Sequence, residues 1–422
     1  MDKKQISGND WINKCIIFLT GQTISLFGSM LVQYAIGWHI TLSTKSGLML
    51  TVFIIFGCVP QVLISLFAGV WADRFDRKLL IVIADSAIAV STLILAILLT
   101  FGFDNIWLLF IISAIRSFGA GIQTPAVGAF LPDIVPEDKL MRVNGINASI
   151  QGAMMFIAPL AAGGLYGIMG LASTLWVDVV TAVIGISMLL LIKVDKVVKK
   201  IDEQSHVLRE MTSGIRYVFQ TKWLRQFLGF YLIFTLVLGP VMVLTPLMVA
   251  RSFGDEAWRL VAHEVAFATG MTAGGLAVGI LAKKIRNTAH MVIVACIAFG
   301  ITTFAMGFSP NFWFYLGVML PMGVTWPFIN SGSMTVFQTK VQPEFLGRVL
   351  SLVSIIINAS VPLSMAIFGP MADYVRVETL LVITGAVMII IPIFMMRFKE
   401  MIAAGQQLPE DETAVTEVDS VQ

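Results

Sequence analysis

The chain has 422 residues, of which 57% are hydrophobic and only 13% are charged. Soluble domains carry about 25% charged residues, so this composition, with a mean hydropathy of +0.87, excludes an ordinary soluble protein and indicates a membrane protein. The net charge of +2 gives no reason to expect a nucleic-acid partner, because most of the charges fall in the segments between apolar runs.

Twelve apolar runs are long enough to cross a bilayer as helices, which takes about 20 residues each. In chain order they cover residues 13–40, 47–72, 79–101, 105–131, 143–169, 171–192, 223–250, 260–282, 290–308, 312–336, 349–372 and 379–396. We therefore expect an all-α membrane protein with twelve transmembrane helices. The first run is too long for the apolar core of a cleaved signal peptide.

The longest polar break predicts the domain organisation. It covers residues 193–222 and separates an N-terminal six-helix half (1–192) from a C-terminal six-helix half (223–400). The spacing of apolar residues over 207–219 predicts a helix along the cytoplasmic face, and the acidic, polar residues 401–422 predict a disordered tail. Similar Pro-Glu segments end at Arg142 before the fifth run and at Arg348 before the eleventh, which indicates that the halves are repeats.

Basic residues predict the orientation. Most of the 28 Lys and Arg residues fall in the tails and in the loops on one side; four fall on the other side, namely Lys45, Arg251, Arg259 and Arg376. Because cytoplasmic loops are rich in Lys and Arg, both termini are predicted to be cytoplasmic.

A charged loop lies between the second and third runs, with five charges in the six residues from Asp73 to Lys78. Charges are costly in hydrocarbon, at about 2.5–3.5 kcal/mol each on insertion scales, so this loop lies at a membrane surface. Residues 69–78 resemble the loop signature of the major facilitator superfamily, although the family usually has Gly where this chain has Asp76. The resemblance implies two halves that rock about a central substrate site. It also implies a conformational gate, for which we expect Gly69, Asp73, Arg74, Arg77, Lys78, Arg142 and Arg348.

Arg116 lies about eleven residues into the fourth run, or roughly 16 Å along a helix. A guanidinium at that depth must face the protein interior, and residues 116–121 resemble the superfamily's fourth-helix pattern that is linked to proton coupling. The alternative is an Arg that binds carbonyl groups and so holds helices together.

Three carboxylates within the runs are further proton-coupling candidates: Asp85, Asp178 and Glu264. Asp178 and Glu264 lie near the outer thirds of their runs and are the preferred carriers, ahead of His39 and His263. For Asp85 we expect instead a pairing with a basic residue of the charged loop.

Polar and aromatic residues in mid-run are candidates for a substrate cavity, with interhelical hydrogen bonds as the alternative. They are Gln22, Gln33, Tyr34, Trp38, Gln123, Asn147, Gln151, Trp326, Asn330 and Asn358. Residues 152–164 resemble the fifth-helix signature of superfamily antiporters, with Ala158 in place of its first Gly and the Gly163-Gly164 pair one residue late. Close helix packing is the alternative for this segment.

Several segments together resemble the macrolide-efflux branch of the superfamily: residues 21–26, 72–78, 116–119, 123–126 and 343–349. The resemblance implies a multi-pass drug/proton antiporter of a bacterial plasma membrane that exports macrolide-like or other bulky amphipathic compounds. Its expected partners are the lipid bilayer, protons and the substrate; we expect a monomer, with no nucleic acid, cofactor or metal. The alternatives are an exporter of a siderophore, lipid or other metabolite, and a non-transporting membrane sensor. An enzyme is not expected, because the chain has no P-loop, Rossmann glycine pattern, Ser-His-Asp arrangement or H-E-x-x-H motif.

Overall fold

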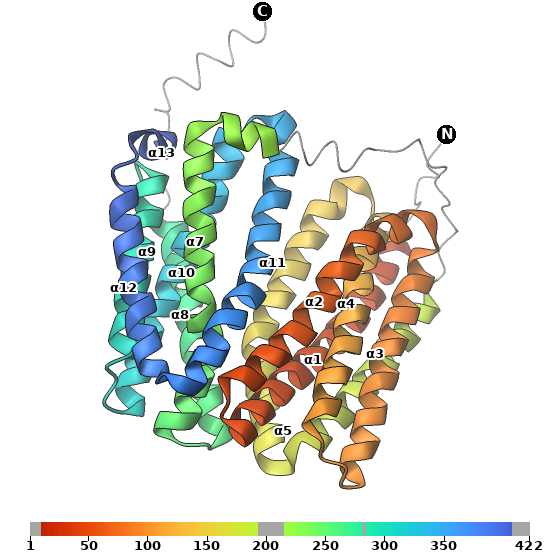
Figure 1. The fold of residues 1–422 in the computed structure, drawn as a ribbon. Coiled ribbons are helices and arrows are strands. Elements are labelled where there is room, and N and C mark those ends of the chain that lie inside the picture. Colours follow the sequence, from red (N-terminus) through yellow and green to blue (C-terminus); the bar gives the residue numbers. More distant parts are fainter. Residues whose placement is uncertain (1–9, 193–214, 282–283, 407–422) are drawn as a thin grey trace, which may run out of the picture. The chain divides into compact units, whose positions relative to one another are not determined.

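A computed structural model describes residues 10–192, 215–281 and 284–406 of the chain (Figure 1). Within these ranges the elements are helices, and the one exception is an isolated β-bridge between Asn287 and Gln406. The prediction of an all-α protein is therefore confirmed for the described part of the chain.

The first helices are α1 (Asp10–Thr44), α2 (Gly47–Arg74), α3 (Arg77–Thr100) and α4 (Ile106–Ile134). Polar side chains begin three of them: Ser46, Asp76 and Asn105 each accept a hydrogen bond from a backbone N–H in the first turn of the following helix. Such caps satisfy N–H groups that have no partner within the helix. The cap also explains Asp76, the residue that departs from the superfamily pattern, because its carboxylate accepts from Leu79 N at 3.2 Å.

Helix α5 (Leu140–Leu191), which follows the short 3-10 turn η1 (Glu137–Lys139), contains two membrane crossings. Its 52 residues would extend about 78 Å as one straight helix, more than twice the thickness of a bilayer core. Gly170 interrupts it with φ 76° and ψ −175°, a conformation that is open to glycine and costly for other residues. The described part has 11 helices that are long and apolar enough to cross a membrane, and α5 holds both the fifth and the sixth predicted runs.

The later helices are α7 (Lys222–Met248), α8 (Ala257–Leu281), α9 (Thr288–Met306), α10 (Phe312–Lys340), α11 (Pro343–Tyr374) and α12 (Val377–Met395). A π-helical turn, η2 (Val249–Phe253), extends α7. The helix predicted over 207–219 is described only from residue 215, and residues 215–220 are helical; its earlier part lies outside the described residues.

The start of the predicted disordered tail is corrected by the structure. Residues Lys399–Ala404 form the short helix α13. The next residue, Gly405, accepts a hydrogen bond from Thr288 N at 2.8 Å, and Asn287 Nδ2 donates to Ile402 O at 2.9 Å. These bonds hold the segment against the start of α9. Residues 407–422 lie outside the described residues.

The chain divides into two compact units. Unit 1 comprises Met1–Gln204, Pro246–Val265 and Gly369–Asp373, and unit 2 comprises Ser205–Thr245, Ala266–Phe368 and Tyr374–Gln422. The helices α7, α8 and α11 therefore contribute one short segment each to unit 1, while the rest of each helix belongs to unit 2. This division differs from the predicted halves at those short segments, at the central loop and at the tail after residue 400, which falls in unit 2.

Each unit has its own packed interior. In unit 1, α1 packs along α5, α2 along α4, and α3 against both α4 and α5; Phe18 and Phe130 meet in its core with ring centroids 5.1 Å apart. In unit 2, α9 packs against α10 and α12, and Phe227 contacts Phe337 edge to face at 5.1 Å. The predicted proton-coupling residues all lie in unit 1.

Candidate functional site

Arg116 is buried in α4 and forms an ion pair with Asp178 of α5. Its Nη1 also contacts the hydroxyl oxygen of Thr92 on α3, and that hydroxyl lies 3.0 Å from Asp178 Oδ2. Its Nη2 lies 3.4 Å from the carbonyl oxygen of Ser29 on α1. A charge buried without a partner is costly, so the pairing explains how α4 holds a guanidinium at this depth. The carbonyl contact agrees with the interpretation of Arg116 as a residue that holds helices together, and its role in proton coupling stays a prediction.

The close approach of α1 to this ion pair depends on Gly28. A Cβ atom built on Gly28 would lie 2.9 Å from Asp178 Oδ1 and would overlap the hydroxyl of Thr181. A side chain at this position therefore requires α1 and α5 to separate. The glycine allows four helices, α1, α3, α4 and α5, to surround one Arg-Asp pair.

Asp85 of α3 belongs to the same polar cluster. Gln22 of α1 hydrogen-bonds its carboxylate, and Asp178 interacts with it electrostatically. Gln123 of α4 extends the chain of contacts, because its Nε2 donates to Gln22 Oε1 at 2.9 Å. The expectation that Asp85 pairs with a basic residue of the charged loop is thus corrected: its hydrogen-bonding partner is an amide from the first helix.

One oxygen of Asp85 has no partner among the described residues. Asp85 is 5% exposed, and its Oδ2 is buried without a hydrogen bond. Buried polar atoms are nearly always hydrogen-bonded, and an exception is often functional. We call the set Gln22, Asp85, Thr92, Arg116, Gln123 and Asp178 the Arg116 cluster. With both carboxylates ionised it carries one unbalanced negative charge, because Arg116 neutralises only one of them.

Glu264 lies in the part of α8 that belongs to unit 1, and its neighbour is Tyr34 of α1, close enough for the two groups to interact electrostatically. Tyr34 is in ring contact with the buried Trp38, with centroids 5.6 Å apart. His263, beside Glu264, is also buried. The structure therefore places Glu264 near one cavity candidate, Tyr34, and places the other three proton-coupling candidates together in the Arg116 cluster.

The charged loop ties helix ends together inside unit 1. Arg77 donates to the carbonyls of Ala72 (2.9 Å) and Ala129 (2.8 Å) and binds both oxygens of Asp133 at 2.9 Å. Lys78 Nζ donates to the carbonyls of Leu190 and Ile192 at 3.0 and 2.7 Å. Cations at the carboxyl ends of helices complement the helix dipole, which accounts for the basic residues at this position.

The remaining gate candidates lie in different surroundings, and for one of them the structure does not describe the side chain. Arg74 and Arg142 are exposed, and Arg348 of α11 lies over the ring of Phe345 at 5.3 Å. Gly69 has open space where a Cβ would stand. The side chain of Asp73 lies outside the described part of the structure, so its gating role stays a prediction.

Several cavity candidates present polar groups at the surface of their own unit. Gln33 and Gln151 are exposed on α1 and α5, and Asn330 and Asn358 are exposed on α10 and α11. Amide groups at membrane depth are unfavourable against lipid, so these faces are suited to water or a polar ligand. Asn147 is half-buried, and Trp326 contacts Phe299 at 6.2 Å.

Sequence reasoning missed Thr92 and Asp133. A threonine in an apolar run carries no signal of its own, because Thr hydroxyls commonly bond within their helix. Asp133 lies just after the fourth run, and its charge is opposite to that of the basic residues in the 69–78 loop, which was a usable signal. The described residues contain no group of three or more His, Cys, Asp or Glu that could hold a metal ion.

Solved structures with the same fold are membrane transporters. The model matches a peptide transporter, POT, with a TM-score of 0.71 and 12% identity, covering 96% of this chain and 100% of that one. It matches a bacterial homologue of the iron transporter ferroportin with a TM-score of 0.68 and 15% identity, covering 92% and 99%. At these identities the likeness concerns the fold alone.

Sequence relatives extend over most of the chain. Macrolide efflux protein A of Streptococcus pyogenes is 29% identical over 388 residues, which cover 91% of this chain and 96% of that protein. The multidrug efflux pump Tap of Mycolicibacterium fortuitum is 22% identical, with 90% and 95% coverage. The family model of the Major Facilitator Superfamily matches residues 15–364. Together with the helical fold, this match shows that the chain is a multi-pass membrane protein, not an enzyme, and that it belongs to the Major Facilitator Superfamily.

Proposed function

We propose that the protein is a proton-coupled exporter of bulky amphipathic compounds of the macrolide type. The similarity to a macrolide efflux protein over 91% of the chain supports export and this substrate class. The exposed amides on α1 and α5 of unit 1, and separately those on α10 and α11 of unit 2, support polar faces that a substrate can contact. The distribution of basic residues supports an orientation with both termini in the cytoplasm of a bacterial cell.

The observation that carries proton coupling is the partnerless oxygen of Asp85 beside the Arg116–Asp178 pair. One proton added at Asp85 Oδ2 removes the unbalanced negative charge of the cluster. Charge in a low-dielectric interior acts strongly on its surroundings, so this neutralisation changes the relative stability of the helix arrangements that α1, α3, α4 and α5 can adopt. A proton arriving from outside then favours one state of the cycle, and its release to the cytoplasm favours the other.

Glu264 is the second carrier candidate, because it interacts with Tyr34, whose ring contacts that of Trp38. A carboxylate next to aromatic rings also suits the protonated amine that many amphipathic drugs carry. In this role the proton and a cationic substrate exchange at Glu264, whereas Asp85 sets the conformational preference.

Accumulation of labelled erythromycin tests the function in cells that lack their own pumps, with and without the protein and with and without an uncoupler. We expect lower accumulation with the protein and loss of this difference with the uncoupler. Asp85→Asn should abolish the uncoupler-sensitive part while the amount of protein in the membrane stays unchanged.

Asp138→Asn is the matched control, because Asp138 is an exposed loop carboxylate that pairs with Lys139. Unchanged export by Asp85→Asn would exclude Asp85 as the proton carrier and leave Glu264→Gln as the next variant. Equal accumulation with and without the protein would contradict macrolide export itself.

A further inference from the structure

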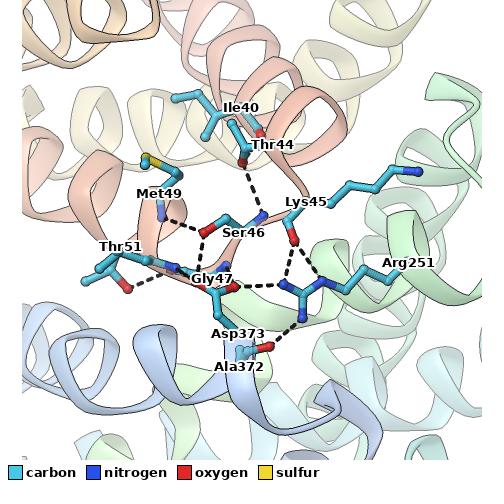
Figure 2. Close-up of polar contacts among 11 residues, drawn as sticks. Ile40, Thr44, Lys45, Ser46, Gly47, Met49, Thr51, Arg251, Ala372 and Asp373 are labelled. Carbon is cyan, nitrogen blue, oxygen red and sulfur yellow. Dashed lines mark hydrogen bonds and ion pairs between the residues drawn. The ribbon is translucent and has the colours of Figure 1, made fainter.

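A third Arg-Asp pair of unit 1, besides Arg116–Asp178 and Arg77–Asp133, lies at the junction of α1 and α2 (Figure 2). Asp373, near the end of α11, accepts hydrogen bonds from Ser46 Oγ at 2.8 Å, Gly47 N at 2.7 Å and Leu48 N at 3.0 Å. The carboxylate therefore binds the free N–H groups at the start of α2, where the helix dipole favours a negative charge. A residue 325 positions away thus adds to the cap that Ser46 supplies.

Arg251, in the π-helical turn after α7, completes this arrangement. Its Nη2 binds Asp373 Oδ1 at 2.8 Å and its Nε binds Lys45 O at 2.8 Å, while its Nη1 contacts Ala372 O. Lys45 has a positive φ of 48°, which is uncommon for a residue other than glycine. Figure 2 shows its carbonyl oxygen directed at the guanidinium.

The backbones at this junction touch. A Cβ built on Gly47 would overlap Gly369 O and lie 2.8 Å from Ala372 Cβ, and one built on Gly369 would overlap Thr51 Oγ1. Ala372 is 1% exposed. We call Lys45, Ser46, Gly47, Arg251, Ala372 and Asp373 the α2 clasp. Its bonds join α2 to short segments of α7 and α11, and the remainder of both helices belongs to unit 2.

We propose that the α2 clasp is a releasable lock of the transport cycle: it holds the ends of α7 and α11 on α2, and it must open for substrate to leave. The proposal rests on the proposed function. Its polar partners are suited to release, because the side chains of Arg251 and Asp373 are 28% and 26% exposed and water can replace their bonds. The nearby Lys45–Asp255 pair, at 3.2 Å, adds a contact between side chains that are 42% and 66% exposed.

A labelling experiment tests the lock without any substrate. Cys15, Cys58 and Cys296 are replaced by Ser, and Ala372→Cys is added as a reporter that the closed clasp buries. We expect slow reaction with a membrane-impermeant maleimide, and a rate about tenfold higher when Arg251→Ala or Asp373→Ala is added, the change expected for loss of a hydrogen bond to a charged group.

Arg376→Ala is the control, because Arg376 is an exposed arginine immediately before α12 and pairs with Glu378 outside the clasp. The proposal is wrong if neither clasp variant raises the labelling rate, or if Arg376→Ala raises it equally.

Cross-linking tests whether the clasp must open. In the background without the three native cysteines, a double variant carries Ser46→Cys and Asp373→Cys. A short bifunctional thiol reagent that can be cleaved joins the two thiols, and each single variant receives the same treatment. We expect the cross-link to stop erythromycin export and its cleavage to restore export to the level of the untreated double variant, while the treatment leaves the export of each single variant at that variant's own untreated level. Export by the cross-linked protein would overturn the proposal. If the unmodified protein exports no erythromycin, the proposed function fails, and the labelling rates still decide whether the clasp opens.

Discussion

The Arg116–Asp178 and Arg251–Asp373 pairs use the same two residue types in opposite surroundings. The first pair is 9% and 1% exposed and lies among four helices, whereas the second is 28% and 26% exposed and lies at helix ends. Removing one member of a buried pair leaves a charge that the interior cannot solvate. Water and salt take over the role of the missing member when the pair is partly exposed. The buried pair is therefore a permanent part of unit 1, and the exposed pair is one that a transport cycle can break.

The largest effect is expected from breaking the buried pair. Arg116→Met leaves Asp178 uncompensated and should destabilise the protein by about 3–5 kcal/mol, whereas the double variant Arg116→Met with Asp178→Leu should recover most of that loss. The loss in the single variant and the recovery in the double variant are both measured by thermal unfolding of the detergent-purified protein and by its level in the membrane. Export should remain absent in the double variant, and a double variant that is no more stable than the single one would contradict the comparison.

A smaller effect is expected from crowding the buried pair without changing its charges. Gly28→Ala places a methyl group against Asp178 and Thr181, and overpacking of this kind costs about 1–3 kcal/mol. Gly164→Ala is the matched control, because a Cβ there has open space. The midpoint of thermal unfolding should fall for the first variant and stay unchanged for the second. Equal midpoints would show that α1 is not tightly fixed at the Arg116 cluster.

The smallest effect is expected at the edge of the α2 clasp, where Asp255 is fully exposed. A hydrogen bond from Lys45 lowers the pKa of Asp255 below its ordinary value of 3.8. The contact therefore stabilises the folded state above pH 3.8, and the stabilisation is lost as the pH falls through the lowered pKa. Asp255→Asn should lower the unfolding midpoint slightly at pH 7 and leave it unchanged at the acid end of the titration. A difference in unfolding midpoint between Asp255→Asn and the unmodified protein that grows as the pH falls would contradict the lowered pKa of Asp255.

The sequence determined the elements and several of their ends. Apolar runs of about 20 residues can cross a membrane as helices that satisfy their own backbone hydrogen bonds. The gap at Gly170 between the fifth and sixth runs and the charged loop before the third run are breaks that the structure confirms. It also indicated that Arg116 must have a polar surrounding, because a guanidinium in an apolar run has no other stable place.

Only the tertiary structure decided which groups meet. Asp85 bonds Gln22 rather than a loop cation, and the partner of Arg116 is 62 positions away on α5. The partner of the α2 N-terminus is 325 positions away on α11. Apolar spacing specifies which residues form a helix but not which helix lies beside it, because lipid tails and neighbouring helices are equally apolar. Small residues such as Gly28, Gly47 and Gly369 allow the close approaches that bring these charged groups into contact, and their effect depends on the backbone opposite, which the sequence does not specify.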